Sequence, residues 1–358
     1  MAQQLKPELK RFLDAGTLIP AHPLALTEAR ELDEEQQRLL TRYYMAAGAG
    51  GIAVGVHSTQ FEIRDPEINL YEKVLQLAAE EVDKAGLDRP FIKVAGICGP
   101  TAQAVQEAQT ALKYGYDMGL LSMGGLQSWT EAEILDRVRA VAAILPVFGF
   151  YLQPSVGGRI FSYDFWRQFA EIENVEAIKV AAFNRYQTLD VVRAVCHASR
   201  RDKIALYTGN DDNIVADLLT TYRFEINGET VEKEFIGGLL GHWAVWTNAA
   251  VKLFEEVKVC KANGRKGMAQ LLTRGVEVTD MNAAIFDPSH AFHGCIPGIH
   301  EVLRKQGLLK GIWCLNPKEQ LSPGQSEEIE RVCAAYPHLI DDEFVKTWMA
   351  KSRSTTSI

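Results

Sequence analysis

A lysine inside an apolar run is the feature of this sequence with the clearest chemical potential. The run is VEAIKVAAF at residues 175–183, and its lysine is Lys179. A lysine in a buried strand loses hydration, which disfavours the ammonium form and lowers its pKa. An amine with a lowered pKa can attack a carbonyl carbon and form an imine. The structural alternative is a lysine whose stem reaches the rim of a sheet, which suits Lys93 and Lys203 near strand starts.

Tyr151 is the second candidate, because it lies near the end of the preceding apolar run, residues 146–152, and Pro154 follows it. If the two runs form neighbouring parallel strands, the phenol lies at the level of Lys179. A phenol in that position can shuttle protons between amine, carbinolamine and leaving group. Alone, Tyr151 would more often be a core aromatic residue, and its pairing with Lys179 is what favours a catalytic role.

Residues at the ends of three other apolar runs complete the candidate set. His57 could act as a general acid or base near neutral pH, or it could be a hydrogen-bonded structural histidine, and both interpretations stay open. Ser58 and Thr59, with nearby backbone N–H groups, are expected to hold a substrate carboxylate. Asn210 and Trp243 are expected to contact the substrate.

The elements that must position these residues are eight short apolar runs bounded by turn residues. They lie at residues 17–24, 51–56, 91–97, 118–123, 146–152, 175–180, 203–209 and 237–245. A strand–helix unit takes roughly 30 residues, so each interval between runs has room for one helix and two loops. This alternation predicts a (β/α)8 TIM barrel, with an open α/β sheet of fewer strands as the alternative.

Three of the intervals carry clear helix signals. Residues 34–47 follow the N-cap candidate Asp33 and end at Gly48, residues 101–114 end at a glycine, and residues 130–144 begin with a capping-box spacing. In a barrel of this kind chemistry takes place at the carboxyl ends of the strands, which is where the candidate residues lie.

The predicted domain organisation is a barrel over residues 1–262 and a helical extension packed on it over residues 263–352. A hairpin around Asn227-Gly228, at residues 223–235, is expected to project from the face opposite the active site. Residues 353–358 are expected to be a disordered tail.

Two motifs carry a resemblance to a known family. The stretch YLQPSVGG at residues 151–158 followed by Ile178-Lys179, and TGND at residues 208–211, resemble the Y-N-x-P-x-x-T-G … I-K and S-G-D-D motifs of the dihydrodipicolinate synthase and N-acetylneuraminate lyase superfamily. The resemblance covers roughly residues 17–262. It implies a class I aldolase-type lyase on a (β/α)8 barrel, in which Lys179 forms a Schiff base with a 2-oxo acid, usually pyruvate, and Tyr151 relays protons.

The sequence also departs from that family. VHSTQ at residues 56–60 stands where the family has G-T-T-G-E, SMGG at residues 122–125 replaces a tyrosine pair, and Val156 replaces the arginine of the synthases. We therefore expect a divergent member that is not a dihydrodipicolinate synthase proper. An aromatic pocket mouth indicates a less charged and bulkier substrate; its residues are Phe148, Phe150, Trp243 and Trp246.

Composition excludes several classes of protein. The 358 residues include 38 Lys and Arg against 46 Asp and Glu, a net charge of −8, which argues against a nucleic-acid partner. No apolar run approaches the roughly 18 residues of a membrane span, and the start of the chain has no signal-peptide core. The six cysteines form no CxxC pair. We expect a cytoplasmic protein, and the family resemblance implies a homodimer or homotetramer.

We expect a Schiff-base lyase of the aldolase or dehydratase type that acts on a 2-oxo acid, either sugar-acid derived or pyruvate-yielding, and that needs no cofactor. Lys179 would be the nucleophile, Tyr151 the proton relay and His57 an acid or base. One alternative is a catalytically altered barrel that only binds a small metabolite. The other is a metal-dependent barrel lyase, although His290 and His293 have no carboxylate partner fixed by spacing and we expect no metal.

Overall fold

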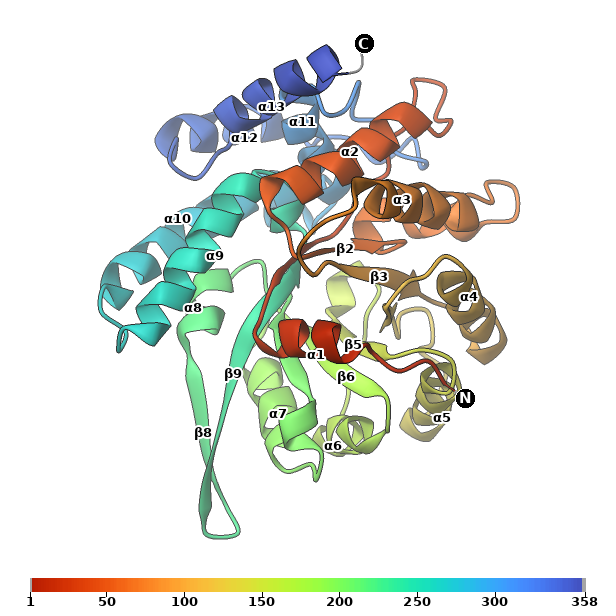
Figure 1. Cartoon of the computed structure of the whole chain (residues 1–358), viewed down its shortest axis with the longest axis vertical. Coiled ribbons are helices and arrows are strands. Elements are labelled where there is room, and N and C mark those ends of the chain that lie inside the picture. Colours follow the sequence, from red (N-terminus) through yellow and green to blue (C-terminus); the bar gives the residue numbers. More distant parts are fainter. Residues whose placement is uncertain (1, 356–358) are drawn as a thin grey trace. The chain divides into compact units, whose positions relative to one another are not determined.

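The computed structural model describes residues 2–355 of the chain (Figure 1). The chain forms two compact units. The first comprises Met1–Thr17 and Asp88–Leu240, and the second comprises Leu18–Leu87 and Gly241–Ile358. The candidate residues are divided between them: Lys179, Tyr151 and Asn210 belong to the first unit, and the others belong to the second.

The first unit is built on a parallel sheet in the order β3-β4-β5-β6-β7-β9. Its strands are β3 (Ile92–Ile97), β4 (Met118–Leu121), β5 (Val147–Leu152), β6 (Val175–Ala181), β7 (Ala205–Thr208) and β9 (Glu229–Leu240). The helices of this unit are α1 (Pro7–Asp14), α4 (Thr101–Lys113), α5 (Glu131–Ala142), α6 (Tyr163–Glu171), α7 (Arg185–Cys196) and α8 (Ile214–Leu219). Most strand residues are buried on both faces, as expected for parallel strands covered by helices.

The second unit contains β1 (Leu18–Pro20) and β2 (Gly51–Val54), which lie side by side and are linked by an N–H···O bond of 2.8 Å from His22 to Ala53. Its first helices are α2 (Glu34–Ala47) and α3 (Tyr71–Ala85). The C-terminal helices follow: α9 (Thr247–Ala262), α10 (Met268–Phe286), α11 (Cys295–Lys305), α12 (Gln325–Ala335) and α13 (Asp342–Thr355).

Eight parallel strands that alternate with helices, followed by C-terminal helices, make this a TIM-type (β/α)8 fold. The predicted fold class is confirmed. Each of the eight predicted runs overlaps a strand. The three predicted helices are also present, because the caps act as expected: the Asp33 side chain accepts from the N–H of Gln36, Gly48 ends α2 with φ 96°, and Thr130 and Glu133 cap α5 reciprocally.

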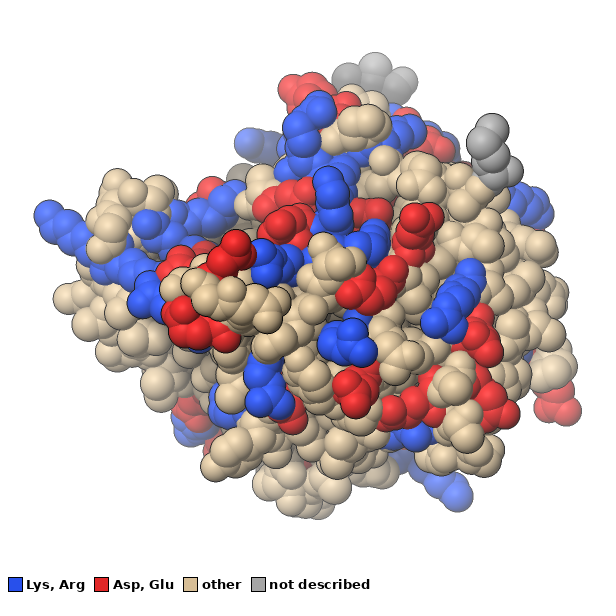
Figure 2. Space-filling model, turned by 90° about the horizontal axis from the view of Figure 1, so that it is seen from below, with Lys and Arg blue, Asp and Glu red and all other residues tan. Residues whose placement is uncertain are grey.

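The predicted hairpin forms between β8 (Thr221–Ile226) and β9. Asn227 and Gly228 make its two-residue turn with φ values of 52° and 82°, the positive angles that this turn type needs. One boundary differs from the prediction: the last barrel strand begins at Glu229 and not near 237, because the second hairpin strand continues directly into it. In Figure 1 the hairpin extends past α6 and α7. Figure 2 shows that acidic and basic side chains are interspersed on the face seen from below.

The C-terminal end of the described chain is helical. Helix α13 reaches Thr355, three residues into the segment predicted to be a disordered tail, and residues 356–358 lie outside the described residues. Among residues 2–355, no helix combines the length and the apolar character that crossing a membrane requires.

Candidate active site

Lys179 lies on β6 with its side chain on the face of the sheet that carries large aromatic residues. The register aligns its Cα with Phe150 on β5 and with Tyr207 on β7. Its Nζ is 4.4 Å from the centre of the Phe150 ring, a distance typical of a cation–π contact. Two residues earlier on the same face of β5, Phe148 meets the Tyr207 ring edge-on at 5.2 Å.

The lysine is buried, with 8% of the residue exposed. It makes no hydrogen bond or ion pair with any residue that the structure describes. Burial lowers the pKa of Lys179 from its ordinary value of 10.5 to about 8, and the negative charge of Asp211 acts in the opposite direction. At pH 7 about a tenth of such an amine is neutral, against about one part in three thousand for an ordinary lysine.

Gly209 makes room for the lysine stem at the end of β7. A Cβ at position 209 would lie 2.5 Å from Cε of Lys179 and 2.8 Å from Cβ of Ala181, distances that real side chains do not tolerate. The glycine of the TGND segment therefore has a steric role, which is to let Lys179 extend past the neighbouring strand.

Tyr151 lies on the opposite face of β5. The register aligns it with Val180, and its ring stacks on Trp166 of α6 with the centroids 5.3 Å apart. Gly149, two residues earlier on the same face, also points toward this helix, since a Cβ there would lie 2.6 Å from the Phe169 ring. This face of β5 therefore packs on α6.

The expected meeting of Tyr151 with Lys179 is not formed, and Phe150 takes its place. The physical reason is the alternation of side chains along a strand, together with an irregularity of register between Val147 and Phe148. The Tyr151 hydroxyl is buried without a hydrogen-bond partner of normal geometry among the described residues, and burial raises its pKa to about 12. Its predicted role as proton relay stays a prediction.

Asn210 is fully buried and its side chain is committed to protein groups. Its Nδ2 donates to Asp217 at 2.9 Å, and its Oδ1 accepts from the N–H of Phe183 at 2.9 Å. Asp217 also accepts from the hydroxyl of Thr208 at 2.7 Å and from Arg185 at 2.5 Å. The expected contact of Asn210 with substrate stays a prediction, and in this structure the residue fixes the loops that follow β6 and β7.

In the second unit, Ser58 and Thr59 lie in the 3-10 turn His57–Thr59 that follows β2. The Thr59 hydroxyl donates to the carbonyl of His22 at 2.6 Å and accepts from the N–H of Gly55 at 3.0 Å, so it holds the turn together. The Ser58 hydroxyl donates to the same carbonyl at 3.3 Å, whereas its backbone N–H has no hydrogen-bond acceptor within the described part of the chain. An anion cradle here would therefore use the Ser58 N–H before either hydroxyl.

His57 and Trp243 occupy different surroundings in the same unit. The half-buried His57 ring lies 5.8 Å from the ring of Phe61. Trp243 is only 3% exposed, and its ring packs edge-on against Phe254 of α9 at 5.9 Å. The roles predicted for both residues stay predictions, and the packing of Trp243 is that of a core residue.

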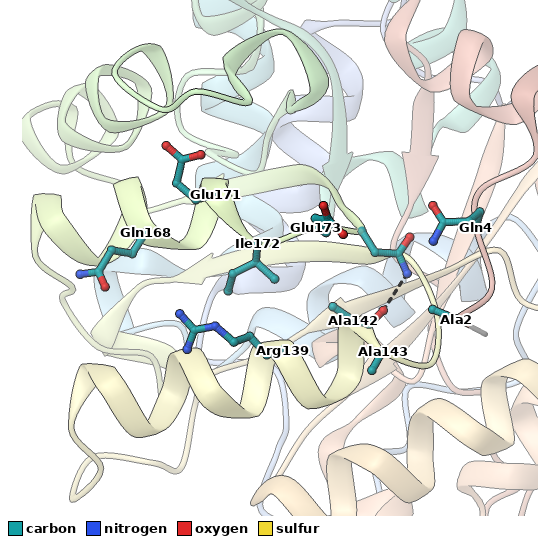
Figure 3. A pocket seen from close by; sticks show the side chains of 10 residues that line it. Ala2, Gln4, Arg139, Ala142, Ala143, Gln168, Glu171, Ile172 and Glu173 are labelled. Atoms are coloured by element: carbon teal, nitrogen blue, oxygen red, sulfur yellow. Dashed lines mark hydrogen bonds between the residues drawn. The ribbon is translucent and has the colours of Figure 1, made fainter.

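The first unit has a pocket of about 430 Å3 (Figure 3), and Lys179 is not among the residues that line it. It is bordered by the ends of α5 and α6 and by the segment before β6, where Asn174 donates to the carbonyl of Ala142 at 2.7 Å. These residues lie at the amino ends of the strands, whereas catalysis in (β/α)8 enzymes takes place at the carboxyl ends. Among the described residues, no three His, Cys, Asp or Glu side chains are grouped in a way that could hold a metal ion.

A sequence model of the dihydrodipicolinate synthetase family matches residues 15–221, which is more than half of the chain. The chain belongs to this family. The dihydrodipicolinate synthetase family comprises Schiff-base class I aldolases and lyases that bind pyruvate and related 2-oxo acids. No curated protein sequence matches this chain.

Several solved structures share the fold of this chain. Dihydrodipicolinate synthase from Oceanobacillus iheyensis matches with a TM-score of 0.71 and 17% identity over 92% of this chain and 99% of that one. CdNal from Clostridium difficile, in complex with mannosamine, matches with a TM-score of 0.70 and 16% identity over 90% and 99%. YagE from E. coli K12, a prophage protein of the dihydrodipicolinic acid synthase family in complex with pyruvate, matches with a TM-score of 0.70 and 16% identity. The match covers 89% of this chain and 98% of that one.

The sequence indicates Lys179 as a candidate nucleophile, which stays a prediction, but it does not indicate that Phe150 lies beside the lysine. Phe150 was expected only at the pocket mouth, although the alternation along β5 already separates it from Tyr151 by one step. The register aligns Lys179 of β6 with Phe150 of β5, so these two side chains lie on the same face of the sheet. Tyr151 aligns with Val180 and lies on the other face. The one-residue irregularity in register leaves no mark in the sequence.

Proposed function

We propose that this protein is a Schiff-base lyase that acts on a 2-oxo acid through Lys179. The observation that carries the proposal is the environment of this amine. It is buried at an aromatic face, it makes no ion pair with a described residue, and its pKa is lowered to about 8. Membership of a family of class I lyases supplies the type of chemistry.

The proposed reaction begins when neutral Nζ attacks C2 of the 2-oxo acid. The carbinolamine loses water and gives an iminium ion, which draws electrons from the neighbouring carbon. In an aldol cleavage the C3–C4 bond breaks, C4 leaves as an aldehyde after its hydroxyl proton is removed, and the enamine takes a proton at C3. In a dehydration, C3 loses a proton and the hydroxyl leaves from C4. Water then hydrolyses the imine and restores the lysine.

The substrate is proposed to be sugar-acid derived or pyruvate-yielding, and not the substrate pair of dihydrodipicolinate synthase. Val156 stands where the synthases carry an arginine, so a second carboxylate has no guanidinium there. The face that carries Lys179 also carries the buried rings of Phe148 and Phe150, which are apolar and bring no charge to the surroundings of the amine. Both features favour a substrate with a single carboxylate.

The orientation of Tyr151 favours one second candidate, a barrel that binds 2-oxo acids without turning them over. Its phenol lies against Trp166, so the step after imine formation lacks an evident proton relay on this strand. The two candidates differ in outcome: both trap a 2-oxo acid on Lys179, and only the lyase releases a product.

The test is a panel of 2-oxo acids, from pyruvate to 3-deoxy sugar acids, assayed for product formation and for inactivation by borohydride. The lyase is supported if at least one sugar-derived acid turns over, borohydride inactivates the enzyme only when a 2-oxo acid is present, and Lys179→Arg abolishes both. Lys93→Arg is the matched control, since Lys93 is an equally buried lysine at the start of β3. Inactivation without turnover across the panel would favour the binding protein. The absence of both inactivation and turnover would refute both candidates.

A further inference from the structure

The outer edge of β8 is a strand edge with no partner. Within the described chain β8 pairs only with β9, in an antiparallel register from Thr221 opposite Glu234 to Ile226 opposite Glu229. The strand reads TYRFEI and has neither a proline nor a bulge in this pairing, two of the devices that block a strand edge, and its charged residues Arg223 and Glu225 are of opposite sign. Figure 1 shows that the hairpin extends past α6 and α7.

The turn determines which backbone groups point outward. A two-residue turn closes on a hydrogen-bonded pair, here Ile226 and Glu229, and such pairs alternate along an antiparallel ladder. The backbone groups of Phe224 and Tyr222 therefore point to β9. Those of Arg223 and Glu225 point to the open edge.

We propose that this edge pairs with the same edge of a second copy of the chain, antiparallel and centred on Phe224. In that register Arg223 of each copy lies opposite Glu225 of the other in a hydrogen-bonded pair, and the two Phe224 side chains meet at the two-fold axis. If one copy of β8 is shifted by two residues along the other in one direction, Arg223 lies opposite Arg223. A shift of two residues in the other direction places Glu225 opposite Glu225. Like charges directly opposite are unfavourable, so only one of these three registers is complementary.

The side chains suit this pairing. Arg223 and Glu225 share the exposed face of β8, where Arg223 bonds Glu232 of β9 at 2.9 Å and Glu225 accepts from the Thr230 hydroxyl at 2.6 Å. Both ion-pair partners of this face are well exposed, with 67% of the Arg223 and 50% of the Glu232 side chain accessible. The opposite face of β8 carries Tyr222 and Phe224, both half-buried, and the Tyr222 ring packs edge-on against Phe235 of β9. The edge-to-edge pairing would join two hairpins into a four-stranded sheet.

The test is sedimentation of the full-length chain over a range of concentrations. Wild type is expected to dimerise. Each single variant, Arg223→Glu or Glu225→Arg, places two like-charge pairs in the interface. Each is therefore expected to raise the dissociation constant of the dimer by about tenfold or more. The double variant R223E/E225R exchanges the charges and is expected to restore the dimer. An equimolar mixture of the two single variants is expected to form a heterodimer, because one chain then carries two glutamates and the other two arginines.

Glu232→Gln is the matched control, because it removes the ion pair within the hairpin and leaves the interface pairs intact, so its mass should equal that of wild type. Circular dichroism checks that every variant is folded. A wild-type chain that stays monomeric would overturn the proposal. So would single variants that assemble like wild type, or a double variant that fails to recover what the single variants lose.

Discussion

The Nζ of Lys179 lies 4.4 Å from the centre of the Phe150 ring, and the two residues are paired across β5 and β6. The ring attracts the ammonium form, so it offsets part of the effect of burial on the lysine pKa. We expect Phe150→Leu to lower the pKa of Lys179 by about half a unit to one unit, since a cation–π contact contributes about 0.5–1 kcal/mol or more.

The pH dependence of imine trapping measures this change. Because burial lowers the pKa of Lys179 to about 8, the rate of trapping at low 2-oxo acid concentration should rise with pH and level off above about 8. In Phe150→Leu the rise should move to lower pH. Phe148→Leu serves as the control, because the Phe148 ring meets the Tyr207 ring and is not the ring of the cation–π contact, which is that of Phe150. A profile that moved to higher pH would show that the ring does not stabilise the ammonium.

Gly209→Ala is expected to slow imine formation strongly without unfolding the chain. The new Cβ would lie 2.5 Å from Cε of Lys179, so the lysine stem must move. We expect a loss of trapping of at least about tenfold, because displacement of a reacting atom by about 1 Å can cost a hundredfold. Thermal melting is the control for folding, and a variant that traps pyruvate as fast as wild type would show that the stem tolerates the contact.

Tyr151→Phe separates the structural role of this residue from the predicted relay. Its hydroxyl has no hydrogen-bond partner of normal geometry among the described residues, and its ring stacks on Trp166. We expect imine trapping within about twofold of wild type, because general acid–base catalysis contributes about 100-fold or more only when the phenol reaches the reacting groups. A loss of that size in Tyr151→Phe would assign the relay to Tyr151 and would require its ring to turn toward Lys179.

Asp217→Ala tests the buried network that fixes the loops beside Lys179. Asp217 is 1% exposed and accepts from Thr208, Asn210 and Arg185. Its removal leaves the buried donors of Thr208 and Asn210 without this acceptor, which should cost about 1–3 kcal/mol of unfolding free energy for each of them. Urea denaturation measures the loss, and Asp190→Ala is the control, since Asp190 forms an exposed pair with Arg193 and should change stability by less than about 1 kcal/mol.

The strands, the helices with strong caps and the catalytic lysine candidate were all predictable from local patterns. Asp33 and Gly48 bound α2 as expected because capping depends on neighbours in the chain. The face that a strand residue presents depends on register with the next strand, and this is why Phe150, not Tyr151, lies beside Lys179. The hydrogen bonds of Asn210 with Asp217 and Phe183 could not be predicted, because they join loops that come together only in the folded chain.

The most direct measurement of the central claim is peptide mapping after reduction. The chain is incubated with isotopically labelled pyruvate, reduced with borohydride, digested and examined by mass spectrometry. We expect one labelled peptide, the one that contains Lys179, with a mass increase equal to reduced pyruvate less the water lost on imine formation. Label on another lysine, or no label on Lys179 when the positive control of a known class I aldolase is labelled, would contradict the assignment of Lys179 as the nucleophile.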